Sequence, residues 1–119
     1  MRHTRVIVKK SSEGEVFSIA PRVKNILLLS GERIMFVLVE LQEGSTVPMH
    51  SHPHEQMGLC LRGSANFQTE NGTTTVGRGQ AYLIPGNERH SVTNVSKGGA
   101  VFLDTFSPPR EDYLAKAAQ

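Results

Sequence analysis

Four side chains able to bind a metal ion stand at alternate positions of one short stretch. Residues 44–63 read GSTVPMHSHPHEQMGLCLRG, and the alternate positions hold His50, His52, His54 and Gln56. Because successive side chains of a strand point to opposite faces, these four would share one face of an extended segment. Imidazole is the commonest metal-ligating side chain, and an amide oxygen can complete its coordination. The stretch therefore predicts a metal-binding strand.

A second stretch, residues 79–94 (GQAYLIPGNERHSVTN), adds another imidazole at His90. Three imidazoles and one oxygen donor make a set of four protein ligands that leaves room for water or substrate. We expect this set to consist of His50, His52, Gln56 and His90. The alternative is that the histidines are ordinary surface residues or hydrogen-bonded core residues.

The fourth ligand is one of three neighbouring residues: Glu55, Gln56 or His54. Glu55 carries a charge but has the opposite parity to His52, whereas Gln56 shares its parity. Because Pro53 interrupts the strand, His54 remains a possible substitute for Gln56. A neutral amide leaves one more unit of net positive charge on the site than a carboxylate would. That charge favours a Lewis acid over a redox centre.

The elements that must hold these ligands are short strands. Eleven glycines and six prolines divide the chain into about ten short apolar segments, a pattern typical of an antiparallel β-sandwich or small barrel. Val6–Lys9 is one possible strand, and the apolar run Ile34–Leu41 predicts a strand buried on both faces. The Asn-Gly pair at 71–72 predicts a hairpin. Helical character is confined to a short tail, Asp112–Gln119.

Composition bounds the class of protein. The 119 residues fit one domain, residues 1–119, and a formal net charge of +2 without a basic cluster gives no support for nucleic-acid binding. The lone cysteine, Cys60, excludes an internal disulfide and fits a reducing compartment. Met1–Lys10 does not resemble a signal peptide, and the longest apolar run, Ile34–Val39, is too short to cross a bilayer. We expect a cytoplasmic protein with no membrane partner.

The two metal-binding stretches resemble the paired motifs of the cupin superfamily. The first motif, G-x5-H-x-H-x3,4-E-x6-G, is matched by Gly44, His50, His52, Gln56 and Gly63, with glutamine in place of glutamate. The second, G-x5-P-x-G-x2-H-x3-N, is matched by Gly79, Pro85, His90 and Asn94. Asn87 replaces its middle glycine, a mild change because asparagine tolerates a left-handed backbone. The resemblance implies a double-stranded β-helix, or jelly-roll barrel, around one divalent metal ion.

A narrower resemblance involves residues 104–114, DTFSPPREDYL. Together with the HSHPHEQ segment, this run looks like the KdgF-type cupins of pectin and alginate degradation. Those proteins are similar in carrying Asp, Phe and Arg there as catalytic or substrate residues, which implies these roles for Asp104, Phe106 and Arg110. The resemblance further implies an isomerase-type enzyme that opens the ring of 4,5-unsaturated uronates to linear keto acids.

The same three residues can be judged on physical grounds. Asp104 shares a strand face with Phe102 and Phe106, and a carboxylate beside apolar walls is costly without a partner, so we expect a raised pKa suited to proton transfer. The alternative is a structural aspartate bonded to backbone amides. Arg110 would clamp a substrate carboxylate, or else pair with a nearby acid such as Asp112. Phe106 would form a wall for a sugar ring, or serve packing alone.

The sequence also permits two other functions and suggests a second copy of the chain as a partner. An oxygen-dependent, dioxygenase-like cupin could use the same ligands, and so could a non-catalytic module that binds a sugar acid or a metal. The ligand set accepts Zn, Ni, Fe, Mn or Cu. We also expect a homodimer, since sheet edges need covering and the segment Arg2–Lys10 could pair with a second copy.

Overall fold

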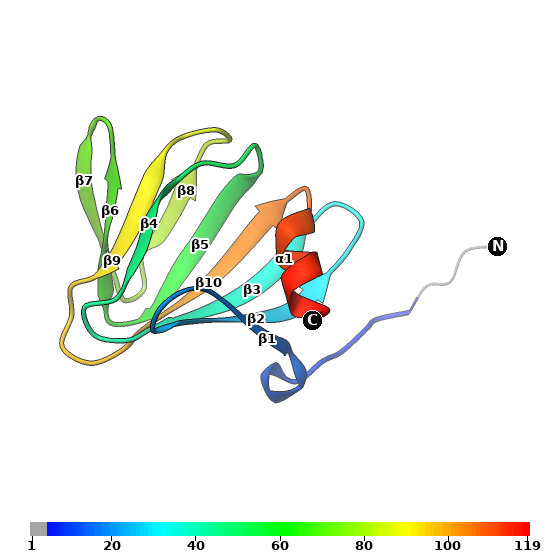
Figure 1. The fold of residues 1–119 in the computed structure, drawn as a ribbon. Coiled ribbons are helices and arrows are strands. Elements are labelled where there is room, and N and C mark those ends of the chain that lie inside the picture. Colours follow the sequence, from blue (N-terminus) through cyan, green and yellow to red (C-terminus); the bar gives the residue numbers. More distant parts are fainter. Residues whose placement is uncertain (1–4) are drawn as a thin grey trace.

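The structure, a computed structural model, describes residues 5–119 as ten strands and one α-helix (Figure 1). The strands are β1 (Glu15–Ala20), β2 (Val23–Ser30), β3 (Met35–Leu41), β4 (Thr46–His50), β5 (Glu55–Arg62), β6 (Ser64–Thr69), β7 (Gly72–Gly77), β8 (Ala81–Ile84), β9 (His90–Asn94) and β10 (Ala100–Ser107). A single 3-10 turn, Ser11–Glu13, precedes them, and the helix α1 (Glu111–Ala117) follows. The all-β fold with a short helical tail is confirmed.

The strands form two antiparallel sheets that face each other. One sheet has the order β1-β2-β3-β10-β5-β8, and the other has the order β4-β9-β6-β7. From β3 to β6 and from β7 to β10, each strand lies in the opposite sheet to the one before it, whereas β1, β2 and β3 share one sheet and β6 and β7 share the other. This crossing from sheet to sheet is the double-stranded β-helix that the cupin resemblance implies. It places β4, β5, β9 and β10 around a common interior (Figure 1).

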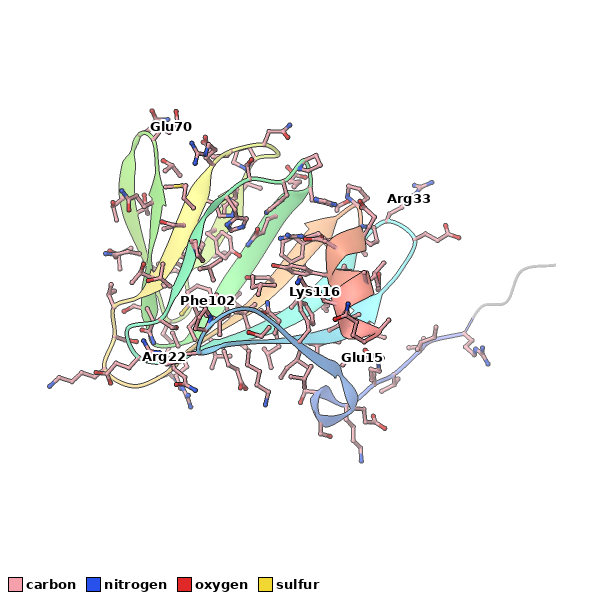
Figure 2. All side chains as sticks on the ribbon, viewed as in Figure 1. Glu15, Arg22, Arg33, Glu70, Phe102 and Lys116 are labelled. Carbon is pink, nitrogen blue, oxygen red and sulfur yellow. The ribbon has the colours of Figure 1, made fainter. Side chains whose placement is uncertain are left out.

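The hydrophobic core lies between the two sheets. In β10 the buried positions alternate with partly exposed ones, and Phe102 and Phe106 are each only 2% exposed. Phe102 lies between the two sheets (Figure 2). Met35 and Val37 of β3 are fully buried on the same side. Burying a large apolar side chain contributes about 1.5–3 kcal/mol, so this alternation is what selects the strand register.

The prediction of a strand buried on both faces was wrong for Ile34–Leu41. Burial in β3 alternates, and Phe36 on the outer face is 39% exposed. In a two-layer sandwich each sheet packs only its inner face on the core, so apolar residues on the outer face stay open unless another layer covers them.

The predicted strand at Val6–Lys9 was also wrong. Residues 5–10 form neither strand nor helix, and Val6 and Val8 are 88% and 84% exposed. Strand propensity needs a neighbouring strand to become structure, and this segment leads away from both sheets (Figure 1). Arg2–Thr4 of the proposed pairing segment lie outside the described residues. Within residues 5–119, no helix is long and apolar enough to cross a membrane.

Candidate metal centre

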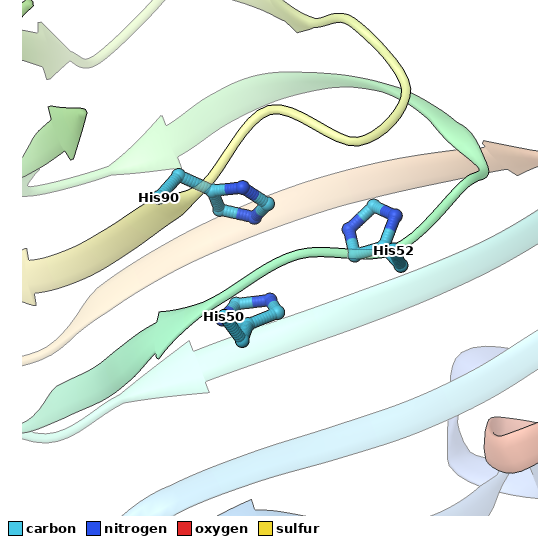
Figure 3. A group of neighbouring side chains, drawn as sticks. All are labelled: His50, His52 and His90. Atoms are coloured by element: carbon cyan, nitrogen blue, oxygen red, sulfur yellow. The ribbon is translucent and has the colours of Figure 1, made fainter. Parts of the chain in front are cut away.

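Three histidines from two neighbouring strands and the loop between β4 and β5 converge at one end of the interior. His50 ends β4, His90 begins β9, and the two residues are directly opposite in the antiparallel pair. His52 lies just beyond β4 and turns back toward them (Figure 3). One ligand nitrogen from each ring lies within 4.8 Å of the others. The structure therefore brings together the three imidazoles that the sequence singles out.

A hydrogen bond of the same kind fixes the orientation of each histidine ring. In all three histidines Nδ1 lies within hydrogen-bond distance of a backbone carbonyl two residues away: His50 with Pro48 O (2.8 Å), His52 with His54 O (3.1 Å) and His90 with Glu88 O (2.8 Å). A carbonyl only accepts, so Nδ1 must carry the proton and donate. Each Nε2 is then left with a free lone pair, the form in which imidazole binds a metal ion.

The surroundings also keep two of these rings neutral. Burial lowers the pKa of His52 to about 4, and the nearby positive charge of Arg110 acts in the same direction. Burial likewise lowers the pKa of His90. Neutral imidazoles are what metal binding requires, because a protonated ring has no lone pair to offer.

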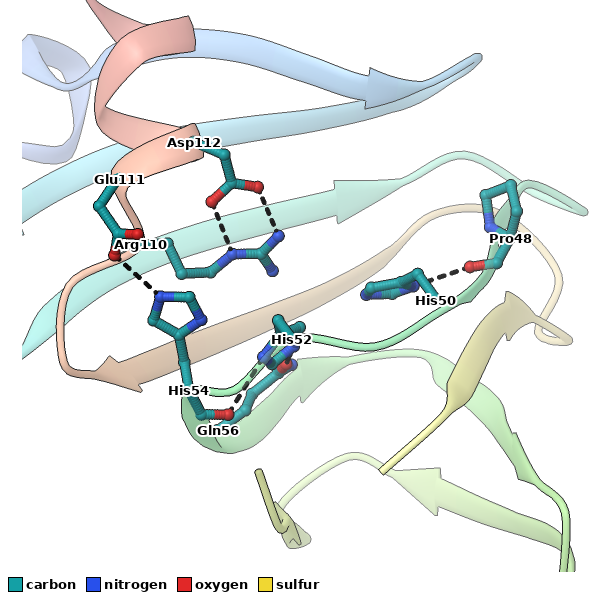
Figure 4. Close-up of polar contacts among 8 residues, drawn as sticks. All are labelled: Pro48, His50, His52, His54, Gln56, Arg110, Glu111 and Asp112. Atoms are coloured by element: carbon teal, nitrogen blue, oxygen red, sulfur yellow. Dashed lines mark hydrogen bonds and ion pairs between the residues drawn. The ribbon is translucent and has the colours of Figure 1, made fainter. Parts of the chain in front are cut away.

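Gln56, on β5, supplies the oxygen donor. Its Oε1 lies 3.0 Å from Nε2 of His52 (Figure 4). Its Nε2 donates to the hydroxyl of Tyr82 at 2.7 Å. With the His52 proton on Nδ1, the contact between Gln56 Oε1 and His52 Nε2 brings together two lone pairs, which repel. A cation bound by both atoms removes the repulsion, and ligands about 2.1 Å from one ion lie roughly 3.0–3.4 Å apart. The donors present therefore fit a metal ion.

Two loops that contact each other hold His52 and His90 in position. The backbone N–H of Asn87 donates to the carbonyl of His52 at 2.7 Å, and Asn87 adopts a left-handed φ of 68°. This explains how asparagine serves where the second motif usually has glycine. A Cβ on Gly86 would collide with the backbone carbonyl of Pro53. The loop that leads to His90 thus rests directly on the loop that carries His52.

The structure places His54 outside this cluster. His54 is 5% exposed, and its Nε2 lies 3.1 Å from Oε1 of Glu111 in α1 (Figure 4). The exposed Glu55 points away from the interior. Of the three neighbours considered as oxygen or nitrogen donors, Gln56 alone places its donor atom beside Nε2 of His52.

Asp104 is buried on the inner face of β10, in line with Phe102 and Phe106 as its spacing predicts. Burial raises its pKa to about 7, against the lowering effects of the Tyr82 hydrogen bond and of Arg110. A Cβ on Gly58 would collide with both the Asp104 carboxyl group and the Tyr82 ring. Glycine at that position is therefore what allows these two groups to meet.

Tyr82 was not among the residues predicted from the sequence. Its hydroxyl donates to Oδ1 of Asp104 at 2.5 Å while it accepts from Gln56. The alternation of β8 places Tyr82 and the buried Ile84 on one face, which the sequence could have shown. The partners of Tyr82 depend on the pairing of β8 with β5, in which Tyr82 lies opposite Gly58.

Arg110 pairs with Asp112, one of the two roles that the sequence left open. Its Nε and Nη2 donate to the two carboxylate oxygens of Asp112 at 3.2 and 2.8 Å, and its guanidinium lies 3.7 Å from the centre of the Tyr113 ring. Nevertheless Arg110 is only 6% exposed, and within the described residues its Nη1 is buried without a hydrogen-bond partner. One donor of this cation therefore has no protein partner among the described residues.

A small cavity and an outer vestibule meet at His50. The cavity has a volume of about 40 Å³, and its polar lining consists of Asn25, His50, Gln56, Tyr82, His90, Asp104 and Tyr113. The vestibule, about 280 Å³, is lined by His50, Arg110, Asp112, Lys116 and neighbouring apolar residues. Its charged lining therefore consists of two cations and one carboxylate, and the carboxylate of Asp112 already pairs with Arg110.

Comparison with known proteins agrees with this architecture. The chain is 31% identical over 93 residues to the pectin degradation protein KdgF of Dickeya dadantii, an alignment that covers 77% of this chain and 84% of that protein. It is 30% identical over 67 residues to the H2HPP isomerase of Bacillus subtilis, covering 56% of this chain but only 28% of that protein.

Fold similarity extends over almost the whole chain. The solved structure of KdgF from Halomonas sp. superposes with a TM-score of 0.82 at 21% identity, covering 92% of this chain and 99% of that one. At this identity the likeness shows the fold alone. The family model of the cupin domain matches residues 37–106, from β3 to β10. With the two motifs, the two-sheet barrel and these matches in agreement, the chain belongs to the cupin family.

Proposed function

We propose that this cupin is a metal-dependent enzyme that opens the ring of 4,5-unsaturated uronates to linear keto acids. The similarity to the pectin degradation protein KdgF supports this substrate class. One observation carries the proposal further: a buried carboxyl group with a pKa of about 7 lines the same cavity as the histidine cluster, and a buried arginine with a free donor lies at its mouth.

One divalent transition metal ion would be held by Nε2 of His50, His52 and His90 and by Oε1 of Gln56. Zn, Ni, Fe, Mn and Cu all accept three imidazoles and an oxygen. When bound, such an ion supplies Lewis acidity, drawing electron density from the oxygens of the sugar. The backbone carbonyls that hold each Nδ1 proton pre-orient the rings for this task.

The reaction needs protons to move but no electrons to be exchanged with an oxidant. As the C1 hydroxyl loses its proton, the bond between C1 and the ring oxygen breaks, which leaves an aldehyde at C1 and an enolate at C5. Carbon C4 then takes up a proton and the enolate becomes a ketone. Asp104 is suited to accept the first proton or to deliver the second, because a group with a pKa near neutrality can do either.

Arg110 and Phe106 would position the substrate. The unpartnered Nη1 of Arg110 offers a charge-assisted hydrogen bond to the uronate carboxylate. Phe106 lies between the His52 ring, 5.8 Å away, and the Arg110 guanidinium, 5.1 Å away. Its ring lines the cavity together with His50 and His90, so it would present an apolar wall to a sugar ring that reaches the metal ligands.

The test is turnover of a 4,5-unsaturated uronate by the metal-loaded protein. Turnover is measured as the decrease in absorbance of the substrate's double bond, once with oxygen present and once without it. We expect equal rates in both atmospheres. The Asp104→Asn variant keeps an acceptor oxygen for Tyr82 but cannot hold the proton, and should lose at least a hundredfold in kcat. Activity that needs oxygen would indicate a dioxygenase-like cupin, and binding without any product would indicate a binding module.

We further propose that the protein is a homodimer that uses the outer face of the six-stranded sheet. Neighbouring strands align Phe36 with Thr105, Met57 and Leu83, and Leu38 with Leu103 and Leu59. Of these, Met57 and Leu83 are each 52% exposed. Six strands about 4.8 Å apart and about 20 Å long give a face of roughly 600 Å², close to the ~800 Å² per partner of stable interfaces. A second copy is therefore the occupant that best fits this face.

A further inference from the structure

Tyr82 joins a metal ligand to the buried carboxyl group. Its hydroxyl accepts a hydrogen bond from Nε2 of Gln56 at 2.7 Å and donates one to Oδ1 of Asp104 at 2.5 Å. The ring is fixed by Phe67, 4.5 Å away between ring centres, and by the absence of a side chain at Gly58.

The direction of these bonds determines which end of the Gln56 amide faces the histidines. A phenol has one proton, and Tyr82 gives it to Asp104, so its oxygen can only accept from Gln56. The amide must then present its N–H to Tyr82. Its oxygen is thereby turned to the opposite side, where it lies 3.0 Å from Nε2 of His52.

This orientation matters because Gln56 differs from the other ligands of the proposed set. The imidazoles are already oriented by backbone carbonyls. An amide rotated by 180° would present its NH2 group, which has no lone pair for a metal ion. A glutamate would need no such control, since either carboxylate oxygen can bind.

We propose that Tyr82 is a positioning residue that holds the Gln56 amide with its oxygen toward the metal, and so ties the metal site to Asp104. The inference rests on the metal site of the proposed function, but not on the uronate reaction. It assigns a role to a side chain outside both cupin motifs' ligand positions.

A double-mutant cycle tests this role through metal affinity. Zn²⁺ is titrated calorimetrically into chelator-stripped wild type, Tyr82→Phe, Gln56→Glu and the double variant. Phenylalanine keeps the ring packing, and equal melting temperatures of the metal-free proteins would check that. We expect Tyr82→Phe to weaken Zn²⁺ binding about tenfold when residue 56 is glutamine, the scale of one lost hydrogen bond. When residue 56 is glutamate we expect less than a threefold effect.

Other outcomes overturn the inference in distinguishable ways. Equal weakening in both backgrounds would make Tyr82 a packing residue, and no weakening in the Gln56 background would remove it from the site. If the Tyr82→Phe chain does not fold, Tyr82→Met provides the same comparison. Failure of the wild type to bind Zn²⁺, Co²⁺ or Ni²⁺ would overturn the metal site as well. Metal binding without uronate turnover would refute only the proposed reaction.

The Co²⁺ form gives a second readout that packing alone would not change. Its visible absorption depends on the number and type of ligands. We expect Tyr82→Phe to change the positions and intensities of the absorption bands as loss of the Gln56 oxygen ligand would change them. In the double variant, Gln56→Glu should restore the bands. Identical spectra for wild type and Tyr82→Phe would contradict the proposed orientation of the amide.

Discussion

Asp104 is a carboxyl group whose surroundings favour its protonated form. Its pKa is raised from 3.8 to about 7 by burial, although Tyr82 donates to it and Arg110 lies nearby. In the folded chain the proton is therefore retained over a pH range in which the unfolded chain has already lost it. Stability from this group is complete below pH 3.8 and is lost as the pH rises toward 7 and above.

This predicts how the stability of the metal-free protein depends on pH. The interval between 3.8 and about 7 corresponds to a loss of roughly 4 kcal/mol in the free energy of unfolding. Asparagine does not titrate, so Asp104→Asn should gain stability relative to wild type as the pH rises. His52, with its lowered pKa, acts in the opposite sense between about pH 4 and 6.5, but it is present in both proteins.

Urea denaturation of wild type and Asp104→Asn at pH 4, 6 and 8 measures this difference. From pH 4 to pH 8, the free energy of unfolding of Asp104→Asn should rise by several kcal/mol relative to that of wild type. A gap that stays constant with pH would show that Asp104 does not keep its proton on folding.

Single residues could be predicted from the sequence where spacing alone decides. The alternation of His50 and His52 and the family spacing to His90 indicated their convergence, and the parity of Asp104 with two phenylalanines indicated its burial. The role of Tyr82 could not be predicted in this way. Its partners come from a strand pairing and from the space left by Gly58, and neither is visible in local spacing.

At the scale of elements, two loops position His52, which lies beyond the end of its strand. β4 ends at His50, so His52 is held by the loop 51–54 and by its contact with the loop before β9. Gly86 has no space for a side chain against Pro53. Because the obstructing atom is backbone, it cannot move without moving His52.

Gly86→Ala should therefore weaken metal binding. The added methyl group would push the loop of His52 away from His90, and a displacement of even a few tenths of an ångström spoils a shared ligand geometry. We expect at least a tenfold loss of Zn²⁺ affinity by calorimetry. Gly31→Ala is the matched control, since a Cβ there makes only an ordinary contact 3.6 Å from the Ile34 carbonyl. Equal affinities for the two variants would contradict the locking of the loops.

Element boundaries were predictable only where a strong local signal exists. The Asn-Gly signal correctly placed a hairpin between β6 and β7, although Thr69 pairs with Gly72, so the turn residues are Glu70 and Asn71. Val6–Lys9 has the same β-rich composition as true strands but no partner in the described chain. Composition cannot distinguish these cases, because a strand is defined by its neighbours.

At the scale of the whole molecule, the outer face of the six-stranded sheet predicts self-association. Replacing Leu59, an exposed residue on the outer face of β5, with lysine would bury a charge in the proposed interface. Leu59→Lys should therefore convert a dimer to a monomer in light scattering coupled to size-exclusion chromatography. Val95→Lys is the control, since Val95 is 49% exposed on the connection after β9. A wild-type monomer, or a Leu59→Lys dimer, would refute the interface.

The convergence of three imidazoles and one amide on a single cation is the claim on which the account depends. Its most direct test is elemental analysis of dialysed protein together with calorimetric titration of chelator-stripped wild type and His90→Ala, using Zn²⁺, Ni²⁺ and Mn²⁺. The account predicts one ion per chain for wild type and at least a hundredfold weaker binding for His90→Ala. Absence of binding by wild type for all three ions, or unchanged affinity in His90→Ala, would contradict it.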